Sequence, residues 1–142
     1  MTQENKELLF RDINGRLTYG VKAYIKNWSK LDRKYYEGTY TIESTYLSLN
    51  NIYATSDRGS VEVIVGYDDY EIKPYLIPMD MMTEEQEIEF NELYTFDPLS
   101  KETHWKLIDW LNKNMFDYRG LIEKGLALDA SYLNIYNNDT GR

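Results

Sequence analysis

The sequence predicts an α+β fold with an N-terminal helix, four or five short antiparallel strands and C-terminal helices. Three observations support this: apolar residues at helical spacing near the N-terminus, an alternating pattern that begins at Thr18, and a helix-capping pattern at Thr83. Elements in this order are typical of α+β proteins. The strands are compatible with an SH3-like or Sm-like small barrel, but their irregular lengths do not establish closure. The 142 residues fit a single domain, 1–142.

The first helix is predicted over residues 3–13. Thr2 can accept a hydrogen bond from the first turn, apolar side chains at 8, 9 and 13 share one side, and Gly15 is placed to end the helix. A type I′ hairpin turn at Asn14 and Gly15 is the competing interpretation. The helix is favoured because residues 6–10 do not alternate between polar and apolar types.

Strands are predicted from Thr18 onward, where the period changes to two. Apolar residues at 21, 23 and 25 alternate with Lys or Tyr at 22, 24 and 26, which is typical of a sheet with one face in water. Further strands are predicted over residues 36–49, 52–55, 60–67 and 70–76. The last contains Pro74, which has no N–H to donate, so we expect it at an edge of the sheet.

The C-terminal half is predicted to be helical. Thr83 and Gln86 form a capping box, and the apolar face that follows carries residues 90, 93 and 94. Asp97 and Pro98 are predicted to begin another helix that runs to about residue 115. A short helical turn over residues 118–124, ended by Gly125, completes the prediction.

Composition and charge indicate the cellular compartment and the kinds of contact that the protein can make. The chain has no cysteine, which excludes structural disulfides and thiolate metal sites, and it has no apolar run long enough to span a membrane, so we expect a cytoplasmic protein. The net charge of −8 is unevenly distributed. Residues 80–97 hold seven carboxylates and no Lys or Arg, whereas residues 16–34 hold six basic residues and one acidic residue. Such asymmetry favours electrostatic steering or head-to-tail contact, although solvated surface faces also explain it.

Several segments together resemble a family of small uncharacterised proteins from gut Bacteroides-type bacteria, their phages and mobile elements. The matching segments are residues 109–128, which include Asp117-Tyr-Arg-Gly-Leu-Ile-Glu-Lys-Gly-Leu-Ala-Leu128, residues 73–79, residues 82–85, and residues 7–13 with 16–22. The resemblance implies a phage or mobile-element context. It supplies no activity, cofactor or site residue.

No catalytic constellation is evident. His104 is the only histidine and is interpreted as a boundary residue of its helix. Glu85 and Glu89 have the i, i+4 spacing that could hold a hard cation, but no calcium-loop motif accompanies them. Gly120 and Gly125 are not followed by the residues of a phosphate loop. We therefore expect no enzyme, cofactor or metal.

The leading hypothesis is a non-enzymatic interaction module that binds a protein partner. The acidic helix, Glu84 to Glu92, would attract a basic partner or mimic the charge of nucleic acid. Aromatic residues are frequent anchors of interfaces, unless they fill the core. The candidate residues are Glu84, Glu85, Glu89, Trp105, Trp110, Phe116 and Arg119.

The alternative function is binding of single-stranded nucleic acid through the basic and aromatic segment 22–36. On one face of a strand, cations would contact phosphates and rings would stack on bases. Lys and Tyr are equally ordinary on the solvent face of a sheet. The candidate residues are Lys22, Tyr24, Lys26 and Trp28.

Overall fold

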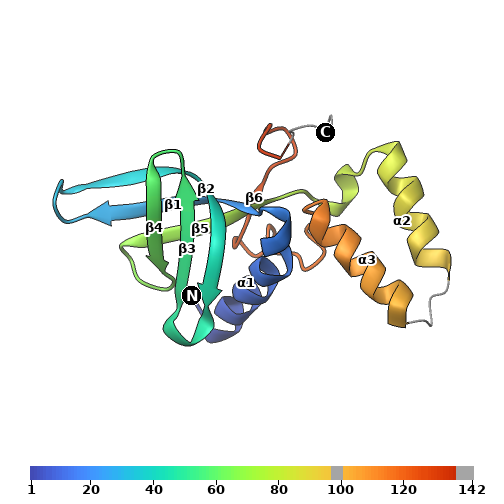
Figure 1. The fold of residues 1–142 in the computed structure, drawn as a ribbon, viewed down its shortest axis with the longest axis horizontal. Coiled ribbons are helices and arrows are strands. Elements are labelled where there is room, and N and C mark those ends of the chain that lie inside the picture. Colours follow the sequence, from blue (N-terminus) through green and yellow to red (C-terminus); the bar gives the residue numbers. More distant parts are fainter. Residues whose placement is uncertain (97–100, 137–142) are drawn as a thin grey trace.

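A computed structural model of the protein describes residues 1–96 and 101–136. It confirms the α+β class: helix α1 (Gln3–Arg16) comes first, a six-stranded sheet follows, and helices α2 (Glu84–Phe96) and α3 (Lys101–Lys113) lie near the C-terminus. In Figure 1 the molecule is elongated, with the closed end of a long β-hairpin at one extreme and the α2–α3 pair at the other. Helix α1 lies between them.

The sheet has the order β4-β3-β2-β1-β5-β6, and all neighbouring strands are antiparallel except β5 and β6. The five predicted strands are confirmed. The sixth was missed because it has only two residues, too few to show a period. The bounds are β1 (Lys22–Ser29), β2 (Lys34–Tyr46), β3 (Asn51–Ser56), β4 (Gly59–Ile64), β5 (Tyr70–Leu76) and β6 (Leu128–Asp129).

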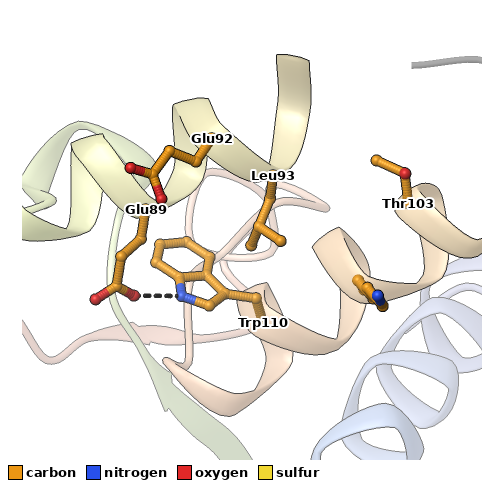
Figure 2. Close-up of a pocket in the computed structure, with 6 residues that line it drawn as sticks. Glu89, Glu92, Leu93, Thr103 and Trp110 are labelled. Atoms are coloured by element: carbon orange, nitrogen blue, oxygen red, sulfur yellow. Dashed lines mark hydrogen bonds between the residues drawn. The ribbon is translucent and has the colours of Figure 1, made fainter. Parts of the chain in front are cut away.

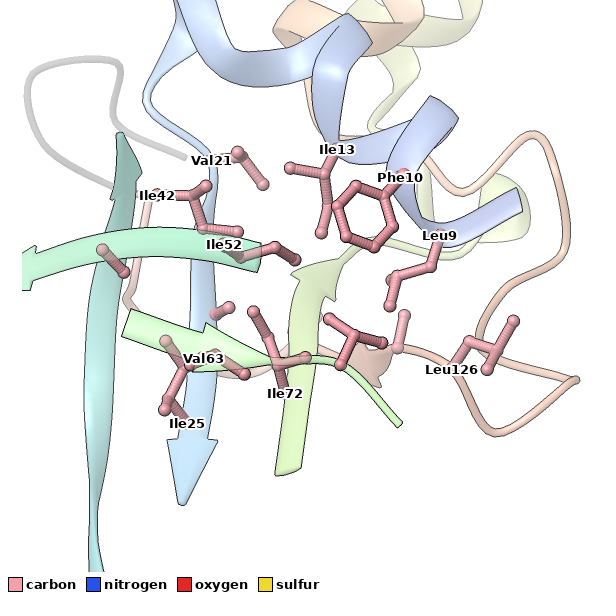
Figure 3. Close-up of a cluster of buried hydrophobic side chains, with 14 of the residues drawn as sticks. Leu9, Phe10, Ile13, Val21, Ile25, Ile42, Ile52, Val63, Ile72 and Leu126 are labelled. Atoms are coloured by element: carbon pink, nitrogen blue, oxygen red, sulfur yellow. The ribbon is translucent and has the colours of Figure 1, made fainter. Parts of the chain in front are cut away.

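The sheet does not close into a barrel, so the small-barrel possibility is not realised. Its two edge strands, β4 and β6, are not paired with each other. The open side is filled instead by α1 and by apolar residues of the C-terminal segment, among them Met115, Leu121 and Leu126, which join the same buried cluster as the sheet. Figure 3 shows Leu9, Phe10 and Ile13 of α1 facing the sheet residues across this core.

Helix α1 begins as predicted but does not end at Gly15. Thr2 accepts a hydrogen bond from the Asn5 N–H at 3.1 Å, which confirms the cap and excludes the hairpin interpretation. The helix continues to Arg16, and a 3-10 turn then leads to Gly20, whose φ of 72° ends it. Gly15 serves packing instead, because a Cβ there would lie 3.1 Å from the Asn112 side chain of α3.

The edge position predicted for Pro74 is wrong for the strand as a whole, since β5 lies between β1 and β6. Among the described residues, β6 pairs with β5 only at Tyr75 and Leu76, immediately after the proline. The missing N–H is therefore tolerated where the second neighbour has not yet begun.

The C-terminal predictions are confirmed in part. Thr83 Oγ1 accepts from the Gln86 N–H at 3.1 Å, and the Gln86 side chain accepts from the Thr83 N–H at 2.9 Å. The predicted start at Asp97 and Pro98 lies outside the described residues. Residues 118–124 form turns and not a helix, because the Asp117 carboxylate takes the N–H groups of Leu121 and Ile122 at 2.8 and 2.9 Å.

A buried ion pair connects α1 to the C-terminal segment. Arg16 and Asp12 are both fully buried, with Arg16 Nε 3.0 Å from the Asp12 carboxylate. Arg16 also donates to the carbonyl oxygens of Leu111 and Phe116, at 3.5 and 2.7 Å. Arg119 approaches the same Asp12 carboxylate at 3.1 Å. One charged pair thus satisfies the carbonyl groups exposed where α3 ends.

Replacing Arg16 with leucine should lower the free energy of unfolding by about 3 to 5 kcal/mol, because it leaves Asp12 buried with only Arg119 as a charged partner. Chemical denaturation measures the loss. Arg11→Leu, at an exposed position of the same helix, is the control and should change stability by less than about 0.5 kcal/mol. Equal effects of the two substitutions would contradict a stabilising role for the buried pair.

Candidate partner-binding site

Helices α2 and α3 form an antiparallel pair that projects from the sheet domain (Figure 1). Helix α3 is attached at its C-terminal end, where Leu111 is buried and Leu107 and Ile108 pack on a second apolar cluster with Tyr75, Ile77, Phe116 and Ala130. Helix α2 contacts the body less, and Phe90 is its residue packed against that cluster. The pair therefore presents much of its surface to solvent.

A hollow of about 470 Å³ lies between the two helices. This volume is within the range of roughly 300 to 1,000 Å³ that ligand pockets have. Figure 2 shows Leu93 and Trp110 at the centre, with Glu89 and Glu92 on the α2 side and Thr103 on the α3 side. Its lining residues are Glu89, Glu92, Leu93, Thr103, Lys106 and Trp110.

Trp110 links this hollow to the core. Its ring stacks on the buried Phe116 with centroids 5.6 Å apart and contacts Phe90 at 6.1 Å. Its Nε1 donates to the Glu89 carboxylate at 2.8 Å. Packing on one side and a hydrogen bond on the other fix the indole, so the apolar floor of the hollow is preorganised.

The rim of the hollow is acidic. Glu85, Glu89 and Glu92 are spaced i, i+4, i+7 and share one side of α2, and residues 80–96 contain no Lys or Arg. Lys106 also lines the hollow, but its ammonium group pairs with Glu102 at 3.1 Å. The rim therefore favours a cationic ligand over an anionic one.

The structure separates the predicted partner-binding residues into four groups. Glu89 and Trp110 meet at the hollow, and Glu84 and Glu85 are exposed on the first turn of α2. Trp105 has 69% of its surface exposed, but it does not line the hollow. It shares a side of α3 with Asp109 and Asn112, which lie next to Tyr19 and Gly15.

Phe116 and Arg119 lie in the body of the protein. Phe116 is fully buried, so this aromatic residue fills the core and is not an exposed anchor of an interface. Arg119 is engaged with Asp12 and with the Tyr118 ring, 4.7 Å from its centroid. Sequence reasoning included Glu92 in the acidic helix but missed Leu93, Thr103 and Lys106 as site residues. Their helical spacing was visible, but the pairing of the two helices was not.

The basic and aromatic face of β1 exists as predicted. Strand alternation places Lys22, Tyr24, Lys26 and Trp28 on one face, opposite Thr41, Thr39, Glu37 and Tyr35 of β2. Lys26 lies 4.6 Å from the Tyr35 ring centroid, and Lys22 donates to Thr41 Oγ1 at 2.9 Å. Glu37 and Glu71 are interleaved with these cations, so the face carries both signs of charge.

The structure also describes His104, the acidic side chains and the lengths of the helices. His104 is exposed, not at the apolar boundary. Within residues 1–96 and 101–136, His, Asp and Glu side chains form no group of three or more that could hold a metal ion. Over the same ranges, no helix is long and apolar enough to cross a membrane.

Comparison with known proteins gives no relative: no family model, curated protein or solved structure matches the chain. The resemblance to the gut bacterial family therefore stays a prediction.

The pKa of Tyr24 depends on a carboxylate of the mixed-charge β1 face. Its hydroxyl donates to Glu37 at 2.7 Å, and this bond, followed by burial and the negative charge of Glu37, raises the pKa of Tyr24 to about 12. The bond requires the neutral phenol, so its contribution is complete below pH 10 and is lost as the pH rises through 12. We expect Glu37→Ala to lower this pKa toward 10.

The measurement is a tyrosinate absorbance titration, with the Tyr24→Phe curve subtracted to isolate this residue. Glu43→Ala, a carboxylate on the same strand that accepts from Thr55, is the control and should leave the titration unchanged. An unchanged Tyr24 titration in Glu37→Ala would show that this contact does not form in solution.

Proposed function

We propose that the protein is a non-enzymatic interaction module of a phage or mobile element, and that its α2–α3 pair binds a protein partner. The observation that carries the proposal is the preorganised apolar hollow with an acidic rim, lined by Trp110, Leu93, Glu89 and Glu92. A partner segment of complementary chemistry has an apolar side chain flanked by Lys or Arg.

The two parts of the hollow contribute differently to binding. Burial of an apolar side chain against Leu93 and Trp110 supplies most of the affinity, because removing apolar surface from water is the largest favourable contribution to most protein association. The carboxylates lie at the rim, where solvent screens them, so they mainly raise the association rate and select against acidic partners.

The exposed large apolar residues of α2 and α3 support an interface in this region. Tyr94 and Ile88 on α2 and Trp105 on α3 all have more than half of their surface exposed. Exposed apolar side chains on the helices that form the hollow add surface that a partner can cover.

We expect a synthetic peptide with alternating lysine and leucine residues to bind the protein, and its affinity to fall about tenfold when Glu85, Glu89 and Glu92 are all replaced by glutamine. Glutamine at 89 keeps an oxygen acceptor for Trp110 Nε1, so the indole stays in place. Fluorescence anisotropy of the labelled peptide measures the affinity.

The matched control replaces three exposed carboxylates elsewhere, Glu4→Gln, Asp68→Asn and Glu123→Gln, which changes the net charge equally. It should bind like the wild type. A second peptide with glutamate in place of lysine should not bind. Equal weakening by both triple variants would attribute the attraction to net charge and not to the hollow.

Binding of single-stranded nucleic acid through the β1 face is the alternative, supported by the shared face of its cations and rings. Under this alternative, an oligonucleotide binds at low salt, and Lys22→Gln with Lys26→Gln flattens the dependence of affinity on salt by about one to two units. Trp28→Ala weakens binding through lost stacking. Anisotropy of a labelled oligonucleotide tests it, and no binding at low salt removes it.

A further inference from the structure

The end of the molecule opposite the hollow has complementary chemistry. We call residues 29–36, the closed end of the β1–β2 hairpin, the finger. Pairing of β1 with β5 extends to Asn27, and pairing of β2 with β3 begins at Thr41, so the hairpin projects beyond the rest of the sheet as two strands. In Figure 1 it forms the end of the long axis farthest from α2 and α3.

The finger combines an exposed apolar tip with cations. Leu31 is 92% exposed at its turn. Lys30, Arg33 and Lys34 surround it, and none of them forms an ion pair with another described residue. Asp32, the carboxylate of the tip, accepts a hydrogen bond from the Tyr36 hydroxyl. The charge presented to a partner is therefore mainly positive.

Cross-strand contacts order the finger. The rings of Trp28 and Tyr35 meet edge to face across the two strands with centroids 4.9 Å apart. The Arg33 N–H closes the turn on the Ser29 carbonyl at 2.8 Å. A segment held in one conformation loses less entropy on binding than a flexible loop does.

We infer that the occupant of the hollow is the finger of a second copy of this chain, with Leu31 against Trp110 and Leu93 and the cations beside Glu85, Glu89 and Glu92. This inference rests on the proposed function of the hollow. The finger cannot reach the hollow of its own chain, because the two lie at opposite ends (Figure 1). The contact therefore joins different surfaces of two copies, and it either closes into a pair that docks reciprocally or continues head to tail.

The test uses two charge-reversed variants of the full chain. The finger variant carries Lys30→Glu and Lys34→Glu, and the hollow variant carries Glu85→Lys and Glu92→Lys; Arg33 keeps its left-handed backbone with φ of 54°, and Glu89 keeps its bond to Trp110. Sedimentation velocity of the wild type should show an average mass that rises above 16.9 kDa with concentration at low salt and falls back at ~0.5 M salt.

Each variant alone should sediment as a monomer, because its finger and its hollow carry the same sign of charge. Their equimolar mixture should associate, because the finger of each variant then meets a hollow of opposite charge. A chain that carries both reversals should associate with itself again. The control Arg11→Glu with Lys124→Glu, at exposed positions outside both surfaces, should associate like the wild type. Leu31→Ser should weaken association by at least about tenfold through lost apolar burial.

Failure of self-docking and failure of the proposed function give different experimental results. A wild type that stays monomeric at low salt, with no association in the mixture, overturns the self-docking. If the lysine and leucine peptide still binds, the proposed function of the hollow stands. Self-association of the finger variant alone or of the hollow variant alone also overturns it, since the contact is then elsewhere. Failure of both the peptide and the mixture removes the hollow as a binding site altogether.

Discussion

The guanidinium group of Arg16 is fully buried, and it organises the region where α1 meets the C-terminal end of α3. It neutralises Asp12 one turn earlier in α1 and donates to the carbonyl groups of Leu111 and Phe116, about a hundred residues away in the sequence. A buried charge without such partners would be strongly unfavourable. The last turn of α3 must therefore lie against α1 if both the charge and the carbonyl groups are to be satisfied.

The position of the hollow follows from this attachment. Gly15 lets α3 approach α1 closely at Asn112, and the Tyr19 hydroxyl donates to Asp109 one helical turn earlier. With the C-terminal end of α3 fixed, Phe116 supports Trp110, and Trp110 supports Phe90 of α2. The acidic rim is thus carried by a helix that is tied to the core through a row of aromatic rings.

Only the three-dimensional structure shows that the basic and the acidic segments lie at opposite ends of the molecule. The basic residues of the finger and the carboxylates of α2 lie at opposite ends of an elongated molecule (Figure 1), and the sheet face between them carries both signs. This arrangement favours contacts between different surfaces of neighbouring molecules over nucleic-acid binding along β1. The mixed face also explains why a basic segment in the sequence need not be a phosphate-binding surface: Glu37 and Glu71 come from the neighbouring strands.

The sequence by itself determined the features that depend on neighbouring residues: the alternation of β1, the Thr2 cap, the capping box at Thr83 and the span of β5. Each rests on a period or on a hydrogen bond across three residues, which the chain displays locally. Only the tertiary structure decided that α1 passes through Gly15, that Phe116 and Arg119 lie in the body, and that two helices enclose a hollow. These outcomes depend on partners distant in sequence, such as Asp12 and Arg119. Aspartate and arginine side chains are ordinarily exposed, so no local pattern marks them for burial.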